Sequence, residues 1–564
     1  MKILHNHLGY PINAKKIALI EDGSAPDKVS FTVFDAGSGA AVFRGASTDC
    51  PSSWPNRHYA ALDFSALTEA GDYFISIDGS TPPLVSAPFQ IAAQLYDSQI
   101  LSNLMHYFKS QRCTGIFDQA DSHCPKFGST ERVDVHGGWY DASGDASKYL
   151  SHMSYTNFMN PQQIPQVVWN LIDGRARMPA QSVWLDERMV DEALHGADFL
   201  VRMQDKAGYF YTTVFDRWSK DVTQREVCSY TTQQGHKFDT YQSGYRQGGG
   251  SAIAALARAA GLPRDGEFTR SEYLQAAETG FAHLEQHNLR YLDDGMENII
   301  DDYCALLAAT ELFNATRQSN YASVAELRAA RLIARQHADG WFWADDAKTR
   351  SYFHAAEAGL PYVALMRFLE CLPDSAQAEA CRAALLLGLK HEIRITMQHQ
   401  ANPFAYPRQH VQMPGKTGQD QFFFPHENES GYWWQGENAR LGSLASAALA
   451  AIEHLDNDAA LSAELHHYAH SCLNWIFGFN PFDVCMMQGH GRNNPRYEPG
   501  FRNAPGGVCN GITSGLDNED DIDFKQPADS VPMHSWRWTE QWIPHGAWLF
   551  HALSRLQTTS RTPS

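Results

Sequence analysis

Residues 86–111 read SAPFQIAAQLYDSQILSNLMHYFKSQ, and the pattern of apolar residues changes within this stretch. Up to Ala92 the residues form a short alternating run next to a proline, which is typical of a β-strand. From Leu95 onward, apolar residues recur three and four positions apart, which is the spacing of an amphipathic helix. The stretch therefore separates a strand-rich N-terminal part from a helix-rich remainder.

The residues before this stretch carry a series of short strand patterns. Runs such as KIALI (16–20), VSFTVF (29–34) and GDYFISI (71–77) are alternating or β-branched. Gly, Asp, Ser and Pro separate them, as expected for turns between strands. We expect residues 1–92 to form a small β-sandwich.

The residues after it are mainly helical. Segments such as DEALHGADFLVRMQ (191–204), IIDDYCALLAATELF (299–313) and HGAWLFHALSRL (545–556) keep helical spacing, and about a dozen such segments follow one another. They can close into a ring of helical hairpins or extend as an open solenoid. No repeat of fixed period is evident, and the longest loops are rich in Trp, Tyr, His, Asn and Gly. We therefore expect residues 93–564 to form an all-α ring of hairpins whose loops carry the function.

Length and charge narrow the class of protein. A chain of 564 residues is too long for one ordinary core, which agrees with two domains. The formal net charge of −19 and the lack of a Lys/Arg-rich run argue against a nucleic-acid partner. The chain also lacks the ~18 consecutive apolar residues that a membrane-spanning helix needs. A small neutral or cationic ligand fits this composition best.

The N-terminus and the cysteines indicate a location. The opening MKILHNHLGYPINAKK lacks the apolar stretch of ~7–15 residues that an export signal contains. The ten cysteines are scattered without close regular spacing, which is typical of reduced thiols. We expect a cytoplasmic protein, and the sequence leaves its oligomeric state open.

The most informative loop is VDVHGGWYDASGDASKYLSH (133–152), in which Asp141 and Asp145 follow an aromatic pair. Two carboxylates on one glycine-containing loop can share a water molecule, one polarising it and the other holding it, and their repulsion raises one pKa. General-base catalysis is the natural use of such a pair. The alternative is that Asp145 only caps the helix-like segment that follows, because Asp is a favoured N-cap residue.

A second candidate carboxyl group lies near the C-terminus. Glu540 stands among Trp536, Trp538 and Trp542, just before the last helical segment. A carboxyl group walled by indoles is poorly solvated, which raises its pKa toward the range of a general acid. The alternative is that Glu540 starts the helix and that the tryptophans are part of the core.

Several motifs resemble those of one family in the same order. They are ILHNHLGYP (3–11), GGWYDASGD (137–145), GADFLVRMQ (196–204), YRQGGGSAIAALARA (245–259), ENIIDDYCALLAATEL (297–312), GYWWQGENARLGSLA (431–445) and WRWTEQWIPH (536–545). Over nearly its whole length the chain resembles glycoside hydrolase family 9. That resemblance implies an immunoglobulin-like β-sandwich followed by an (α/α)6 barrel of six hairpins.

The resemblance also implies roles for the three carboxyl groups. Asp145 matches the catalytic base, Asp141 the aspartate that helps to hold the nucleophilic water, and Glu540 the general acid. The family inverts the anomeric configuration, a route that needs room for water between acid and base, with carboxyl groups typically ~6.5–9.5 Å apart. No cofactor is required for this chemistry.

The chain departs from the common cellulase pattern in two places. Ser143 lengthens the aspartate motif from four residues to five, as in a subset of the family. The segment 479–503 holds His490, Arg492 and Arg496 but not the paired histidine–arginine motif of typical endoglucanases, so binding of a long glucan is not expected. The residues that we expect to line the sugar subsites are Trp139, Tyr140, Asp301, Tyr303, Trp433, Trp434, Glu437, His490, Arg492 and Trp538. Solvated helix faces and ordinary core positions are the rival interpretation for them.

A zinc site is a further possibility that the sequence raises. Cys113, His123, Cys124 and His136 are residue types that bind structural zinc, and some relatives of the family hold a metal nearby. Their spacing matches no standard site, and buried free cysteines are common. We therefore expect no metal here.

Within the resemblance, the DASGD, NFMNPQQ and WRWTEQW segments are most similar to intracellular exo-β-glucosaminidases of chitin-using marine bacteria. The expected reaction is inverting hydrolysis of the non-reducing-end glucosamine of short chitosan- or chitin-derived oligosaccharides. A cellodextrin-trimming β-glucosidase or an endoglucanase of the same family is the alternative. A non-catalytic sugar-binding protein would need the tryptophans but not Asp145 and Glu540, and the acidic charge disfavours an α/α-barrel polysaccharide lyase acting on uronates.

Overall fold

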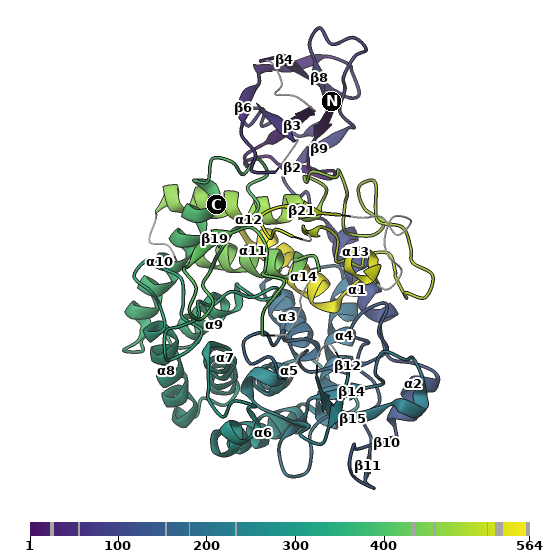
Figure 1. Ribbon diagram of the computed structural model, residues 1–564, viewed down its shortest axis with the longest axis vertical. Coiled ribbons are helices and arrows are strands. Elements are labelled where there is room, and N and C mark those ends of the chain that lie inside the picture. Colours follow the sequence, from purple (N-terminus) through teal and green to yellow (C-terminus); the bar gives the residue numbers. More distant parts are fainter. Residues whose placement is uncertain are drawn as a thin grey trace.

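The computed structural model covers residues 1–564 and shows a small β-domain above a large helical domain (Figure 1). It describes all residues except 23–27, 55–56, 153–154, 180, 232–233, 430–434, 455–457, 516, 525–533 and 560–564. None of the helices in the described part combines the length and apolar character needed to cross a bilayer.

The N-terminal domain consists of two packed sheets. One sheet has the strand order β1 (Lys2–Leu4), β3 (Ile17–Asp22), β7 (His58–Asp63), β6 (Thr48–Cys50). The other has the order β2 (Gly9–Pro11), β9 (Phe89–Ala92), β8 (Gly71–Ile77), β4 (Ser30–Asp35), β5 (Ala41–Ala46). The pairs are antiparallel except β2 with β9. Tyr10 packs edge-on against Phe64 and Phe89 in the core, so the predicted β-sandwich is confirmed.

The helical domain is a closed double ring. The inner helices are α3 (Ile164–Arg177), α5 (Gly250–Ala259), α7 (Ile299–Thr316), α9 (Leu360–Cys371), α11 (Asn438–Ile452) and α14 (Ile543–Thr559). The outer helices are α1 (Ser98–Ser110), α4 (Val183–Arg202), α6 (Arg270–Tyr291), α8 (Ser319–Ala334), α10 (Ala378–Met397) and α12 (Ala459–Ile476). Each inner helix contacts the next, and α14 contacts α3, which closes the ring. The prediction of six hairpins in a closed (α/α)6 barrel, rather than an open solenoid, is confirmed.

Small residues allow the inner helices to approach each other closely. A Cβ atom on Gly442 of α11 would lie 2.9 Å from Trp548 of α14, so this contact tolerates only glycine. On α7 the first fourteen residues are all buried, and Asn298 caps the helix by accepting a hydrogen bond from the Ile300 amide. An inner helix can therefore be apolar on most faces, because another layer covers each of them.

The loops between helices contain short elements. The helical ones are α2 (Ile116–Asp121), α13 (Trp536–Thr539), a 3-10 turn (Val222–Gln224) and a π-helical turn (Tyr245–Gly249). One four-stranded sheet has the order β12 (Lys148–Tyr149), β14 (Thr213–Phe215), β15 (Glu226–Tyr230), β16 (Lys237–Phe238). The two-stranded pairs are β10 (Cys124–Pro125) with β11 (Arg132–Val133), β13 (Phe210–Tyr211) with β17 (Gln242–Ser243), β18 (Gln409–Val411) with β19 (Gln419–Gln421), and β20 (Thr513–Ser514) with β21 (Ile522–Asp523). Strand β12 directly follows the aspartate loop and fixes its C-terminal end.

The two domains share an apolar interface. Trp54 of the β-domain lies 5.4 Å from Phe422 and 6.1 Å from Trp475 of the barrel, measured between ring centroids. Polar contacts add to it, because Asp483 accepts a hydrogen bond from His7 (2.9 Å) and forms an ion pair with Arg492 (2.7 Å). The last β-domain strand ends at Ala92, and α1 begins at Ser98. The β-domain is thus packed on the barrel rather than tethered to it.

Candidate active site

The aspartate loop is held against the segment that precedes α14. Ser143 donates its backbone N–H to Gln541 O (2.8 Å), and the Gln541 N–H donates to Ser143 Oγ (2.9 Å). Ala142 and Trp542 form an antiparallel bridge beside them. Glu540 is therefore brought next to Gly144, where a Cβ atom would overlap the Glu540 carboxylate. The three predicted catalytic carboxyl groups lie in one site although they are far apart in the sequence.

Asp145 is positioned by two donors. Its side chain is 6% exposed and accepts hydrogen bonds from the Ser147 backbone N–H (2.8 Å) and the Tyr149 hydroxyl (2.8 Å). Burial, followed by the charge of Asp216, raises the pKa of Asp145 above its usual value. The carboxyl group is thus oriented and poised to take up a proton, as a general base must be.

Asp141 is the partner of Asp145. Trp542 donates its indole N–H to Asp141 Oδ1 (2.9 Å), which fixes the carboxyl plane. Burial and the charge of Asp145 raise the pKa of Asp141 well above its usual value. The pair can therefore hold a water molecule between a proton donor and a proton acceptor.

Glu540 has the properties of a general acid. Burial, and secondarily the charge of Asp145, raise its pKa to about 8, although Gly144, Lys220 and Asn510 act in the opposite direction. The residue keeps partial exposure to solvent. At neutral pH Glu540 carries a proton that it can donate to a bound molecule.

Two predicted sugar-lining aromatics are buried instead. Trp139 has no exposed surface, and its indole N–H donates to Glu192 Oε2 (3.2 Å) in the core. Tyr140 is 3% exposed and lies under the guanidinium of Arg502, 4.3 Å from the ring centroid. The prediction that they contact sugar is wrong, since they support the aspartate loop from below.

Three residues of the inner helices are also committed to protein partners. Asp301 accepts a hydrogen bond from the Asn298 N–H (3.0 Å) and pairs with Arg246 (3.2 Å). Tyr303 donates to Glu357 (2.9 Å), and both Asp301 and Tyr303 are fully buried. Glu437, in turn, is 3% exposed and forms an ion pair of 2.6 Å with Arg440. The expectation that Asp301 would line a sugar subsite is wrong, because it is fully buried and its charge is balanced by Arg246. Burial likewise removes Tyr303 and Glu437 from contact with sugar.

The remaining predicted contacts lie elsewhere. Arg492 pairs with Asp483 at the domain interface, and His490 bonds to Asn103 of α1 (2.9 Å). Trp538 is 2% exposed and stacks on the Arg537 guanidinium. These side chains are therefore structural. Trp433 and Trp434 lie outside the described residues.

The cysteines near the aspartate loop have partners other than a metal. Cys113 Sγ lies 3.6 Å from Asp121, whose carboxylate pairs with Lys148 (2.6 Å). His136 binds Asp134 (2.6 Å), and His123 binds Ser122 (3.0 Å). Over the described residues, no group of three or more His, Cys, Asp or Glu side chains is arranged to hold a metal ion.

The conformation of one loop beside the aspartate loop, residues 216–220, was not predicted from the sequence. Arg217, Trp218 and Lys220 all have positive φ angles (61°, 58° and 56°), a conformation that non-glycine residues adopt at a cost of ~1–3 kcal/mol each. The loop begins at Asp216, which accepts a hydrogen bond from Ser147 Oγ (3.0 Å). Trp218 is 40% exposed and packs edge-on against Phe215 and Tyr230. The segment FDRWSKD contains no Gly or Asn, which is why its left-handed turn was missed.

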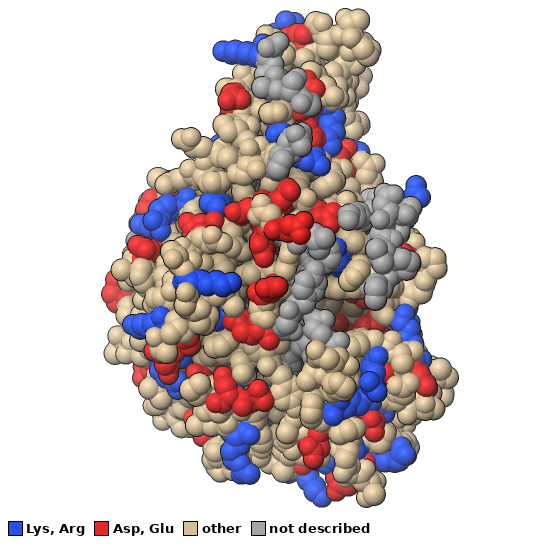
Figure 2. Space-filling model, in the orientation of Figure 1, with Lys and Arg blue, Asp and Glu red and all other residues tan. Residues whose placement is uncertain are grey.

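Acidic side chains are concentrated along the middle of the face shown in Figure 2.

The fold and the site together define the class of protein. A buried aspartate pair beside a protonated glutamate is the arrangement of carboxyl groups with which glycosidases perform acid–base catalysis, and here a closed six-hairpin barrel carries it. The chain belongs to glycosyl hydrolase family 9, whose model matches residues 98–499. Residues 1–82 match the cellulase N-terminal ig-like domain. The resemblance found in the sequence is confirmed at the level of the family.

Relatives agree with this assignment. The chain is 27% identical over 323 residues to a xyloglucan-specific endo-beta-1,4-glucanase of Bacteroides ovatus, covering 52% of this chain and 51% of that protein. It is 34% identical over 164 residues to a cellodextrinase of Butyrivibrio fibrisolvens, covering 26% of this chain and 27% of that one. The matched parts thus span about half or less of these curated relatives.

Solved structures show the same architecture. A family 9 protein of Bacteroides ovatus superposes with a TM-score of 0.66 at 19% identity, over 99% of both chains. A metagenome-derived glycoside hydrolase family 9 endoglucanase gives a TM-score of 0.69 at 19% identity, again over 99% of both. At this identity the likeness shows the fold.

Proposed function

We propose that the protein is an inverting glycoside hydrolase in which Asp145 is the base and Glu540 the acid. The observation that carries this proposal is Glu540, with a pKa of about 8, held beside the two buried aspartates Asp141 and Asp145. Glu540 protonates the leaving oxygen, while Asp145 takes a proton from water that Asp141 helps to hold. Both aspartates stabilise positive charge on the ring carbon in the transition state.

We further propose that the sugar at the cleaved bond is a terminal glucosamine of a short β-linked oligosaccharide. Asp216 adds a fourth carboxyl group to Asp141, Asp145 and Glu540, and its charge acts on Asp145. Among the described residues, Asp216 Oδ2 is buried without a hydrogen-bond partner. Asp216 is itself fully buried, so the support it gives is electrostatic: its charge adds to the negative potential of the site, which favours a protonated amine over a neutral substituent.

A second candidate is trimming or internal cleavage of β-glucans. It is favoured by the activities of the two curated relatives, a cellodextrinase and a xyloglucan-specific endoglucanase. A hydrolysis comparison of glucosamine-, N-acetylglucosamine- and glucose-terminated disaccharides separates the candidates. A clear preference for glucose ends would exclude the glucosaminidase proposal.

The catalytic roles are tested by Glu540→Gln. Loss of the proton donor should lower kcat on a disaccharide by ~10²–10⁴-fold, with a smaller loss on an aryl glycoside whose leaving group needs less protonation. Glu379→Gln is the matched control, because its side chain is 89% exposed on α10. Proton NMR of the first product formed from a β-glycoside should show the α-anomer. Unchanged turnover in Glu540→Gln, or a β-anomer as first product, would contradict the mechanism.

A further inference from the structure

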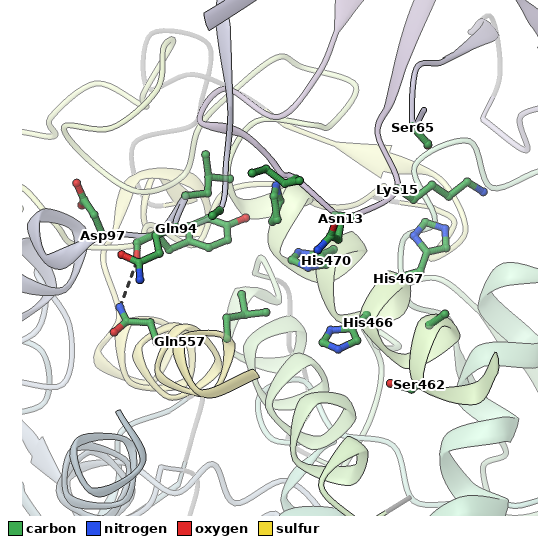
Figure 3. A pocket seen from close by; sticks show the side chains of 18 of the residues that line it. Asn13, Lys15, Ser65, Gln94, Asp97, Ser462, His466, His467, His470 and Gln557 are labelled. Atoms are coloured by element: carbon green, nitrogen blue, oxygen red, sulfur yellow. Dashed lines mark hydrogen bonds between the residues drawn. The ribbon is translucent and has the colours of Figure 1, made fainter. Parts of the chain in front are cut away.

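A cleft of about 1260 Å³ lies where the β-domain meets the barrel (Figure 3). Its walls come from the turn after β2, the linker that leads into α1, the helix α12 and the C-terminal end of α14. Glu540 immediately precedes the N-terminal end of α14, whereas Gln557 lines the cleft. The helix rises ~1.5 Å per residue, so about 20 Å separate the cleft from the catalytic carboxyl groups.

The side chains around the cleft are mainly uncharged hydrogen-bonding groups. Asn13, Gln94, Gln181 and Gln557 contribute amides. Gln181 donates to Gln557 Oε1 (3.1 Å), and Gln557 donates to Tyr96 O (3.2 Å), so these two amides are partly engaged within the protein. Figure 3 shows Gln94 and Gln557 on one side of the cleft and Asn13 on the other. Groups of this kind match the hydroxyls of a neutral sugar, which also donate and accept.

Three imidazoles of α12 complete the polar surface. Burial lowers the pKa of His466, and it lowers those of His467 to about 4 and His470 to about 3. All three are therefore neutral at pH 7 and can each donate and accept one hydrogen bond. His470 is 7% exposed, and within the described residues its Nδ1 has no hydrogen-bond partner.

The cleft also has an apolar floor. Leu95, Tyr96 and Leu556 line it and are at most 9% exposed. An apolar floor with polar walls suits a pyranose, whose C–H faces are apolar and whose edges carry hydroxyls. The carboxylates at the cleft are unsuited to catalysis, because Asp97 caps α1 and Glu464 is exposed at the rim.

We propose that this cleft binds a neutral oligosaccharide without cleaving it. Such a site would give the β-domain a role, since Asn13 and its neighbours form one wall. The proposal concerns binding and does not depend on the hydrolytic activity.

The test is calorimetric titration of the full chain carrying Glu540→Gln with cellotetraose. Ala463→Trp fills the cleft without removing a polar group, and Ala460→Trp is the matched control, because Ala460 is exposed on the same helix but does not line the cleft. The binding stoichiometry should fall by one in Ala463→Trp and stay unchanged in Ala460→Trp. His466→Ala should weaken the same binding event at least tenfold.

Three outcomes would overturn the proposal. The first is an unchanged number of bound cellotetraose molecules in Ala463→Trp, and the second is an equal loss of bound cellotetraose in the control Ala460→Trp. The third is that His466 and His470 bind Zn²⁺ while the cleft does not bind cellotetraose. Turnover of an aryl glycoside by the single variant Ala463→Trp is measured in parallel and should equal that of the unmodified chain. If the protein binds cellotetraose in the cleft but hydrolyses no glycoside, the proposed function is refuted and the cleft proposal stands.

Discussion

Glu540 is only partly exposed, and it keeps its proton because burial disfavours the charged carboxylate and, secondarily, because ionisation would place a second negative charge near Asp145. A general acid works only while protonated, so kcat/KM should fall about tenfold per pH unit above its pKa of about 8. The base must be ionised, so activity should also fall as the pH drops through the raised pKa of Asp145. The pH profile of kcat/KM checks both limbs. A rate that keeps rising above pH 9 would contradict the assignment of the acid.

Asp216 allows a separate test of the base. Its charge raises the pKa of Asp145, and its Oδ1 accepts the Ser147 hydroxyl. Asp216→Asn removes the charge but keeps an oxygen acceptor for Ser147. The acidic limb of the kcat/KM profile should move to lower pH, while the basic limb stays close to that of the unmodified enzyme. An acidic limb that does not move would show that the charge of Asp216 does not influence the pKa of the base Asp145.

From residue chemistry alone, Asp145 and Glu540 could have been either catalytic groups or helix caps. The order of the family motifs favoured the catalytic role. Burial could not be predicted in the same way. Trp139 and Tyr140 stand in the same loop as Asp141, but they face the core, and nothing local distinguishes the two directions. Trp542 became recognisable as the partner of Asp141 only when the aspartate loop and the segment before α14 were placed side by side.

At the scale of elements, the aspartate loop and the Glu540 segment touch through Gly144. A methyl group there would overlap the Glu540 carboxylate and lie 2.7 Å from Phe501. Gly144→Ala should therefore displace the acid and lower kcat/KM by about 10²-fold, the effect of a misplacement of ~1 Å. The control is Gly37→Ala in the β-domain, where the new methyl meets only an ordinary contact of 3.6 Å. Equal kcat/KM in the two variants would contradict the close approach.

A second glycine links an outer and an inner helix. On α4, a Cβ atom at Gly196 would overlap Val168 of α3 and lie 2.5 Å from Trp139. Gly196→Ala should lower the free energy of unfolding by ~1–3 kcal/mol, because overpacking a tight core forces its neighbours to move. Urea denaturation followed by fluorescence measures this. An unchanged or higher midpoint would mean that the two helices can separate at no cost.

Helices and strands were predicted well because their periodicity is local. The spacing of apolar residues located the helices, and the change of pattern between Ala92 and Leu95 agrees with β9 ending at Ala92 and α1 beginning at Ser98. The loops were predicted poorly, since their conformation depends on contacts with distant segments. The turn at Arg217–Lys220 is held by Asp216, its neighbour in the sequence, and by a bond from Lys220 to Gly500 O (2.8 Å). The second contact is not visible locally, because Gly500 lies in a distant segment.

At the scale of the whole molecule, the contacts of Asp483 at the domain interface should stabilise the folded protein. Asp483 binds both His7 and Arg492. Asp483→Ala leaves a buried imidazole and a partly buried guanidinium without their acceptor, at a cost of ~1–3 kcal/mol. Thermal unfolding should shift to lower temperature, and the β-domain should become the first site of limited proteolysis. Asp483→Asn, which keeps an oxygen acceptor, should recover part of the loss. A proteolysis pattern identical to that of the unmodified chain would show that the apolar contacts around Trp54 suffice.

The architecture of the whole chain was predicted from two observations together, the spacing of apolar residues and the order of the family motifs. A dozen helices could have formed an open stack, and the resemblance to family 9 supplied the expectation of six hairpins that the contact of α14 with α3 confirms. The subgroup could not be decided in the same way. Glucosamine and glucose differ in one substituent, and the residue that reads it need not belong to any motif.

The pairing of Ser143 with Gln541 has a consequence for the timing of biosynthesis. Because translation proceeds from the N-terminus, the aspartates leave the ribosome well before Glu540 and α14. Before α14 inserts between α11 and α3, the base has no acid beside it. A nascent chain therefore cannot perform the proposed hydrolysis, and completion of the ring is the event that creates the enzyme.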